Sequence, residues 1–156
     1  MIVGATGHQN IPETALPEVR RDIERVLVRR ANLIGICSLA AGADQLFASI
    51  VLTLGGELHV ILPCAQYETT FTSAAARNQF DVMLARASRV ETLPHPRPSE
   101  LAFLEAGRRV VELADVLVAI WDGKEARGLG GTADIVRYAR SVKRDVIVLW
   151  PTGAVR

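Results

Sequence analysis

The stretch that decides the fold runs Val116-Leu-Val-Ala-Ile-Trp121, Asp122-Gly-Lys-Glu-Ala-Arg-Gly-Leu-Gly130 and Gly131-Thr-Ala-Asp-Ile-Val136. Its first six residues are apolar and rich in β-branched side chains, and Asp122-Gly123 ends the run. This pattern is typical of a strand buried on both faces, as in a parallel sheet. The segment from Gly130 through Thr132 reads as the start of a helix. A strand, a glycine-rich loop and a helix N-terminus therefore follow one another.

This succession is typical of an anion site. Glycine lets the backbone approach a phosphate, and the free N–H groups and the positive end of the helix dipole stabilise it. The alternative is that the glycines only shape the turn between strand and helix.

The rest of the chain repeats the alternation of strand and helix. Strands are expected over six segments, of which the fourth is the weakest: Met1–Ala5, Leu33–Leu39, Leu58–Leu62, Arg89–Leu93, Val116–Trp121 and Val146–Trp150. Apolar residues at helical spacing fill each interval, with Pro17 in the first turn of the first helix and Ser99 as a cap of the fourth. Strict alternation predicts parallel strands joined by right-handed crossovers. We therefore expect a three-layer, Rossmann-like α/β fold with a parallel sheet of about six strands.

The predicted strand order is 4-3-2-1-5-6, with a switch point between the first and fifth strands. Ligands of open parallel sheets bind beyond the carboxyl ends of the strands at such a point. Every glycine-rich turn here follows a strand and precedes a helix. The turns at Gly7-His8, Gly42–Asp44 and Asp122–Thr132 should therefore surround one crevice.

Composition places the chain among single globular domains. It has 156 residues, of which 49% are hydrophobic and 22% charged, so we expect one domain over residues 1–156. A net charge of +1 gives no argument for nucleic acid. No apolar run is long enough to span a bilayer, and no signal-peptide pattern opens the sequence, so we expect a cytoplasmic protein without a membrane partner. The spacing of the two cysteines and three histidines predicts no metal site, and no cofactor is expected.

Four segments together resemble the SLOG superfamily of Rossmann-like domains, which includes the DNA-processing protein DprA and the LOG, or lysine decarboxylase-like, phosphoribohydrolases. They are Thr6-Gly7-His8, Ala40-Ala41-Gly42-Ala43-Asp44, Ala114–Ala119 and Gly130-Gly131-Thr132-Ala133-Asp134. The resemblance extends over nearly the whole chain and is nearer to small stand-alone members than to LOG itself. It implies binding of nucleotides or nucleotide-derived ligands, often by dimers or tetramers.

The charges that the LOG resemblance would require are missing. LOG enzymes carry an Arg-Lys pair on the helix before the fifth strand and a glutamate after the glycine motif. The matching positions here are Ala106, Gly107 and Ile135. Weak catalytic candidates remain nearby or in the loop, namely Glu105, Asp122 and Asp134.

Each candidate ligand residue has a structural alternative. Gly130, Gly131 and Thr132 either hold a phosphate or begin a helix with a threonine cap. Asp44 either accepts a ribose hydroxyl or caps its own helix, and Asp122-Gly123 either contacts the ligand or forms a turn. Gly7 and His8 either approach a base or ribose, or His8 lies in a surface turn, and Gly42 belongs to the same predicted crevice. Arg127 either binds a phosphate or lies on the surface without a ligand. Tyr67 and Phe71 either cover a base or pack in the core.

Three functions are compatible with this pattern. The favoured one is a non-catalytic sensor or binding protein for a nucleotide-type small molecule. The second is a nucleoside 5′-monophosphate phosphoribohydrolase, which needs a carboxylate to assist cleavage of the N-glycosidic bond. The third is a subunit with a vestigial pocket. We also expect a homo-oligomer, most simply a dimer, from the resemblance and from Leu101, Leu104 and Val111 on one helix.

Overall fold

The structure, a computed structural model, describes residues 1–125 and 131–155. Six parallel strands form one sheet in the order β4-β3-β2-β1-β5-β6, which confirms the predicted architecture and strand order. The elements are β1 (Ile2–Gly7), α1 (Leu16–Leu27), β2 (Ile34–Cys37), α2 (Ala43–Thr53), β3 (Glu57–Leu62), the 3-10 helix η1 (Tyr67–Thr70), α3 (Ala74–Arg86), β4 (Arg89–Thr92), α4 (Glu100–Leu113), β5 (Val116–Ile120), α5 (Thr132–Ser141) and β6 (Asp145–Leu149).

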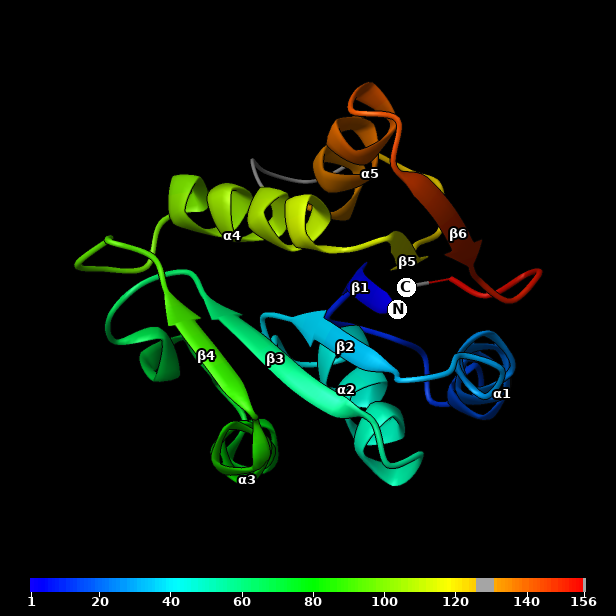
Figure 1. The fold of residues 1–156 in the computed structure, drawn as a ribbon, viewed down its shortest axis with the longest axis horizontal. Coiled ribbons are helices and arrows are strands. Elements are labelled where there is room, and N and C mark those ends of the chain that lie inside the picture. Colours follow the sequence, from blue (N-terminus) through cyan, green and yellow to red (C-terminus); the bar gives the residue numbers. More distant parts are fainter. Residues whose placement is uncertain (126–130, 156) are drawn as a thin grey trace.

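The helices cover both faces of the sheet (Figure 1), with α4 and α5 on one side and α1, α2 and α3 on the other. Strand β5 shows how the sequence produces this arrangement, because all five of its residues are buried. Successive side chains of a strand point to opposite faces of the sheet. Val116 and Val118 therefore belong to the hydrophobic core between the sheet and α1–α3, and Leu117 belongs to the core between the sheet and α4 and α5.

Local signals set several element boundaries. The Ser99 hydroxyl accepts the N–H of Ala102 and caps α4, as predicted. Gly55 follows α2 with φ of 77°, the left-handed conformation of a helix-ending glycine. Helix α1 ends at Leu27, and the N–H of the next residue, Val28, donates to the carbonyl of Glu24.

The exposed surface of α4 is less apolar than the sequence suggested. Leu101 is 51% exposed, but Leu104 and Val111 are buried in this chain's own core under α4 and α5. The latter two therefore give no support to an interface between copies. Within the described part of the chain, no helix is both long and apolar enough to cross a membrane.

Candidate functional site

A cleft of about 630 Å³ opens at the carboxyl edge of the sheet. It is lined by the loops that follow β1, β2 and β3 and by residues at the N-termini of α2, α3, α4 and α5. This convergence follows from the topology, because every helix after a parallel strand begins at the same edge. The size lies within the range of small-ligand sites, and the converging positive helix ends favour a ligand that carries negative charge.

The structure brings together half of the predicted ligand residues. Those that line the cleft are Gly7, His8, Asp44, Gly131 and Thr132. Those that lie outside its lining are Gly42, Asp122 and Gly123. Arg127 and Gly130 fall outside the described residues.

Asp44 lies in the first turn of α2 but does not cap that helix. Its Oδ2 accepts the N–H groups of Ser38 and Ala40, at 3.2 and 3.3 Å, in the loop that leaves β2. The side chain is 7% exposed, and burial raises the pKa of Asp44 to about 7, while the two backbone hydrogen bonds act in the opposite direction. The carboxylate thus joins the β2–α2 loop to the wall of the cleft.

This loop contains a strained residue between the two N–H groups that Asp44 accepts. Leu39 has φ of 57° and is fully buried, a conformation that a leucine rarely adopts. Gln45 donates through Nε2 to the carbonyls of Leu39 and of Ala76 in α3. Asp44 and Gln45 therefore fix the loop in a shape that the backbone alone disfavours.

Two glycines of the predicted site permit close packing of α2 against β1. A Cβ atom on Gly7 would lie 2.4 Å from the Cβ of Ala43, and one on Gly42 would lie 2.3 Å from the carbonyl oxygen of Gln9. Gly42 also has φ of 83°. Their missing side chains make room for neighbouring elements of the protein, so their presence is explained without a ligand.

His8 connects the end of β1 to the loop after β5. Its Nε2 lies 3.2 Å from the backbone N of Asp122 and 3.1 Å from Oδ1 of the same residue. Oδ1 of Asp122 also accepts the N–H of Lys124, which makes Asp122 a turn-forming residue. The His8 ring packs edge-on against Trp150, 5.3 Å between centroids. His8 thus lines the cleft while its ring is held by β5 and the segment after β6.

The N-terminus of α5 forms another part of the cleft wall. Gly131 is its N-cap, with no side-chain cap, and Thr132 is 7% exposed. The N–H groups of Thr132 and Ala133 and the Thr132 hydroxyl have no acceptor or donor among the residues that the structure describes. The Thr132 side chain therefore does not cap its own helix, which was the alternative to phosphate binding.

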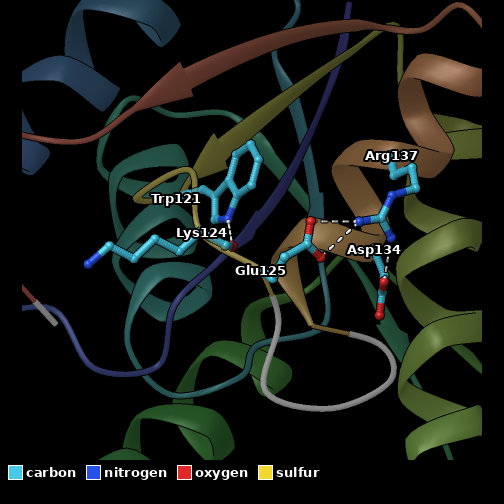
Figure 2. A network of polar contacts seen from close by, with 5 residues as sticks. All are labelled: Trp121, Lys124, Glu125, Asp134 and Arg137. Atoms are coloured by element: carbon cyan, nitrogen blue, oxygen red, sulfur yellow. Dashed lines mark hydrogen bonds and ion pairs between the residues drawn. The ribbon is translucent and has the colours of Figure 1, made fainter.

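Arg137 forms an ion pair with Asp134, the acidic residue in the first turn of α5. Its guanidinium donates to Asp134 Oδ1 at 2.9 Å and to both carboxylate oxygens of Glu125, as Figure 2 shows. Asp134 is absent from the cleft lining. The pairing with Arg137 neutralises a carboxylate that would otherwise repel an anion at this helix end.

Sequence reasoning missed Lys124, which contributes the one lysine or arginine side chain among the described residues of the cleft lining. Trp121 Nε1 donates to the Lys124 carbonyl at 2.8 Å, and in Figure 2 the lysine side chain extends away from the Arg137 network. Its position after Asp122-Gly123 carried the only available signal, a cation next to a glycine-rich loop.

Aromatic side chains form the remaining wall. Tyr67, Phe71 and Phe103 all line the cleft, and Tyr67 makes edge contacts with Phe71, Phe80 and Phe103. The packing of Tyr67 and Phe71 against neighbouring rings is thus observed, and their covering of a base stays a prediction. A rigid aromatic wall of this kind suits a planar ring such as a nucleobase.

The catalytic candidates lie apart from the cleft lining. Glu105 pairs with His95, Asp122 forms its turn and Asp134 pairs with Arg137. In contrast, two positions that hold catalytic charges in the LOG resemblance, Gly107 and Ile135, do line the cleft and are apolar. Asp44 supplies the cleft's one carboxylate among the described residues. Among residues 1–125 and 131–155, no three or more His, Cys, Asp or Glu side chains are grouped so that they could hold a metal ion.

Comparison with solved structures finds the same fold in proteins of low sequence identity. DNA processing protein A from Helicobacter pylori, studied for its single-stranded DNA binding mode, matches with a TM-score of 0.70 and 16% identity over 99% of this chain. DprA from Streptococcus pneumoniae matches with a TM-score of 0.65 and 19% identity over 94% of the chain. A molybdenum cofactor binding protein from the phototrophic bacterium Rippkaea orientalis matches with a TM-score of 0.62 and 16% identity over 96% of the chain.

These matches confirm the predicted fold, which this chain shares with the DNA-processing proteins and the molybdenum cofactor binding protein. The chain spans 67% and 49% of the two DNA-processing proteins and 76% of the molybdenum cofactor binding protein. No family model and no curated protein sequence matches the chain.

Proposed function

We propose that the cleft binds a nucleotide or nucleotide-derived small molecule, with its phosphate at the N-terminus of α5, and that the chain is a binding or sensor protein. The observation that carries this proposal is the helix end at Gly131 and Thr132. Two N–H groups and one hydroxyl there have no partner among the described residues and border the cleft that the aromatic side chains line. A phosphate would accept from these donors, and Lys124 is the one lysine or arginine among the described residues that line the same cleft.

The proteins of similar fold support the class of ligand. One is described as binding single-stranded DNA and another as binding a molybdenum cofactor. For this chain a small molecule fits better than a nucleic-acid strand, because the net charge is +1 and the described cleft lining contains a single lysine. The salt-dependent backbone contacts of a nucleic-acid interface need several cations.

A binding role is favoured over N-glycosidic hydrolysis because Gly107 and Ile135, at two positions where the LOG resemblance would require charged residues, line the cleft and are apolar. Hydrolysis of this type needs a carboxylate next to the glycosidic carbon. The alternative function, a phosphoribohydrolase, would have to use Asp44, because it is the one carboxylate among the described residues of the cleft lining. Its Oδ2 already accepts two hydrogen bonds that hold the β2–α2 loop.

Two measurements test the proposal together. Calorimetry of the full chain with ribonucleoside 5′-monophosphates, and with inorganic phosphate, should show saturable binding that is weakened in Thr132→Val. Chromatography of the same mixtures after long incubation should show no free base. Release of base at catalytic rates would favour the hydrolase, and absence of binding to every nucleotide would overturn the proposal. Light scattering of the same samples tests the proposed dimer.

A further inference from the structure

Four polar side chains that line the cleft are more than nine-tenths buried. His8 is 8% exposed and its ring is held by Asp122 and Trp150, whereas Asp44, Tyr67 and Thr132 are 7%, 5% and 7% exposed. Thr132 belongs to the helix end where the proposed phosphate binds. Asp44 and Tyr67 come from α2 and from η1, which follow β2 and β3. They form a separate polar group within the same cleft.

Asp44 presents one carboxylate oxygen that the protein does not use. Oδ2 accepts two N–H groups from the β2–α2 loop, whereas Oδ1 has no partner within residues 1–125 and 131–155. Oδ1 is not one of the fully enclosed atoms that lack a partner in the described residues, so it is accessible from the solvent of the cleft that Asp44 lines. An asparagine would hold the same loop through its oxygen without a charge, so holding the loop does not require the second carboxylate oxygen.

Tyr67 presents a hydroxyl in the same situation. Its ring is fixed by edge contacts with Phe71 and Phe80, yet its hydroxyl has no hydrogen-bond partner in the described part of the chain. Burial, and after it the negative charge of Asp44, raises the pKa of Tyr67 well above its ordinary value. The phenol therefore stays protonated, and it lines the same cleft as Asp44.

A carboxylate oxygen and a phenol that line one cleft, each without a partner in the described residues, match the chemistry of neighbouring hydroxyl groups. One hydroxyl can donate to the carboxylate, and the phenol can donate to or accept from the next. On a nucleotide this pair is the 2′,3′-diol of ribose. We infer that Asp44 and Tyr67 form a sugar subsite that selects ribonucleotides over 2′-deoxyribonucleotides. This inference rests on the proposed nucleotide function.

Calorimetry of the full chain tests the subsite with matched ligands. The probes are the 5′-monophosphates of adenosine, guanosine, cytidine and uridine, each with its 2′-deoxy counterpart, and inorganic phosphate. The variants are Asp44→Asn, which keeps an acceptor for the loop, and Tyr67→Phe, which keeps the ring. Asp81→Asn and Tyr138→Phe are the controls, because both residues lie outside the cleft lining.

At pH 8, where Asp44 is ionised, the subsite predicts that the best ribonucleotide binds at least about tenfold more tightly than its deoxy form, since a hydrogen bond to a charged group is lost. Asp44→Asn should abolish this ratio, Tyr67→Phe should reduce it, and both controls should keep it. Circular dichroism and thermal melting check that each variant is folded.

The contrary outcomes separate the two proposals. Equal binding of the two sugar forms, tighter than that of inorganic phosphate, would overturn the sugar subsite and leave the nucleotide function standing. A ratio that persists in both Asp44→Asn and Tyr67→Phe would also overturn the subsite. No binding of any nucleotide would overturn both.

Discussion

Ile135 in α5 packs against Gly107 in α4 so closely that a Cβ atom on Gly107 would lie 2.3 Å from Cδ1 of Ile135. The same contact borders the cleft. It joins two helices on one face of the sheet, and it fills with hydrocarbon a place where a hydrolase of the LOG type would carry charges. The packing of α4 against α5 therefore leaves this part of the cleft wall apolar.

The contact predicts a measurable coupling between the two residues. Overpacking in Gly107→Ala should destabilise the protein by about 1–3 kcal/mol. About 1 kcal/mol of this loss should be offset, because alanine favours a helix more than glycine does. Ile135→Ala should cost about 2–5 kcal/mol. The double variant should be less destabilised than the two single effects combined, because the shortened side chain makes room for the new methyl group. Urea unfolding of the four proteins measures this cycle, and strict additivity would show that the contact is not as tight as described.

Asp44 should make stability depend on pH in a direction unusual for an aspartate. Its pKa rises from 3.8 to about 7 on folding, so between these values the folded protein holds a proton that the unfolded chain has lost. Stability should therefore fall as the pH rises from about 4 to about 7 and level off above, by about 4 kcal/mol in all. Asp44→Asn should remove this decline and be the more stable protein at pH 8.

Urea unfolding at pH 5 and pH 8 tests the sign. Asp81→Asn is the control, since Asp81 is exposed on α3. If the difference between the parent protein and Asp44→Asn were the same at both pH values, the burial of Asp44 would not have the energetic effect argued above.

Much of this architecture could be predicted from the sequence. The buried run at Val116–Ile120 and the regular alternation of strands and helices predict parallel strands, and the handedness of crossovers limits their order. The ends of α1 were less predictable. Residues 28–32 carry no glycine or proline to mark where the helix ends, and Asn32 takes a left-handed φ of 49°.

The site could be predicted only in part, for a physical reason. Residues that follow strands at the same sheet edge must lie near one another, which places Gly7, Asp44 and Thr132 correctly. Spacing does not tell what a glycine is for, and contacts show that Gly7 makes room for Ala43. Nor does it tell where a side chain points, so the unpartnered oxygens of Asp44 and Tyr67 emerge only from the packing around them.

Arg137 should influence anion binding without touching the cleft. Arg137→Gln should change the free energy of unfolding by no more than about 1 kcal/mol, because its ion pairs are exposed. It should nevertheless weaken phosphate binding a few-fold, since one positive charge that pairs with the Asp134 carboxylate in the first turn of α5 would be removed. Adding Asp134→Asn to Arg137→Gln should restore the affinity. Calorimetry with inorganic phosphate measures both effects, and a failure of the second substitution to restore binding would assign Arg137 another role.

Gly131→Val tests the location of the proposed phosphate most directly. Gly131 has φ of −71° and ψ of 173°, an extended conformation that valine also adopts, so the fold should tolerate the change with a small loss at the N-cap. The branched side chain would stand beside the N–H groups of Thr132 and Ala133 and obstruct an approaching anion. Binding of the best nucleotide should therefore be abolished in Gly131→Val and largely retained in Gly131→Ser, which is smaller and favours an N-cap. Thr132→Val should weaken binding less, because one hydroxyl bond contributes roughly 0.5–1.5 kcal/mol. Calorimetry on folded variants decides the matter: a Gly131→Val protein that binds the nucleotide as tightly as the parent would place the phosphate elsewhere in the cleft.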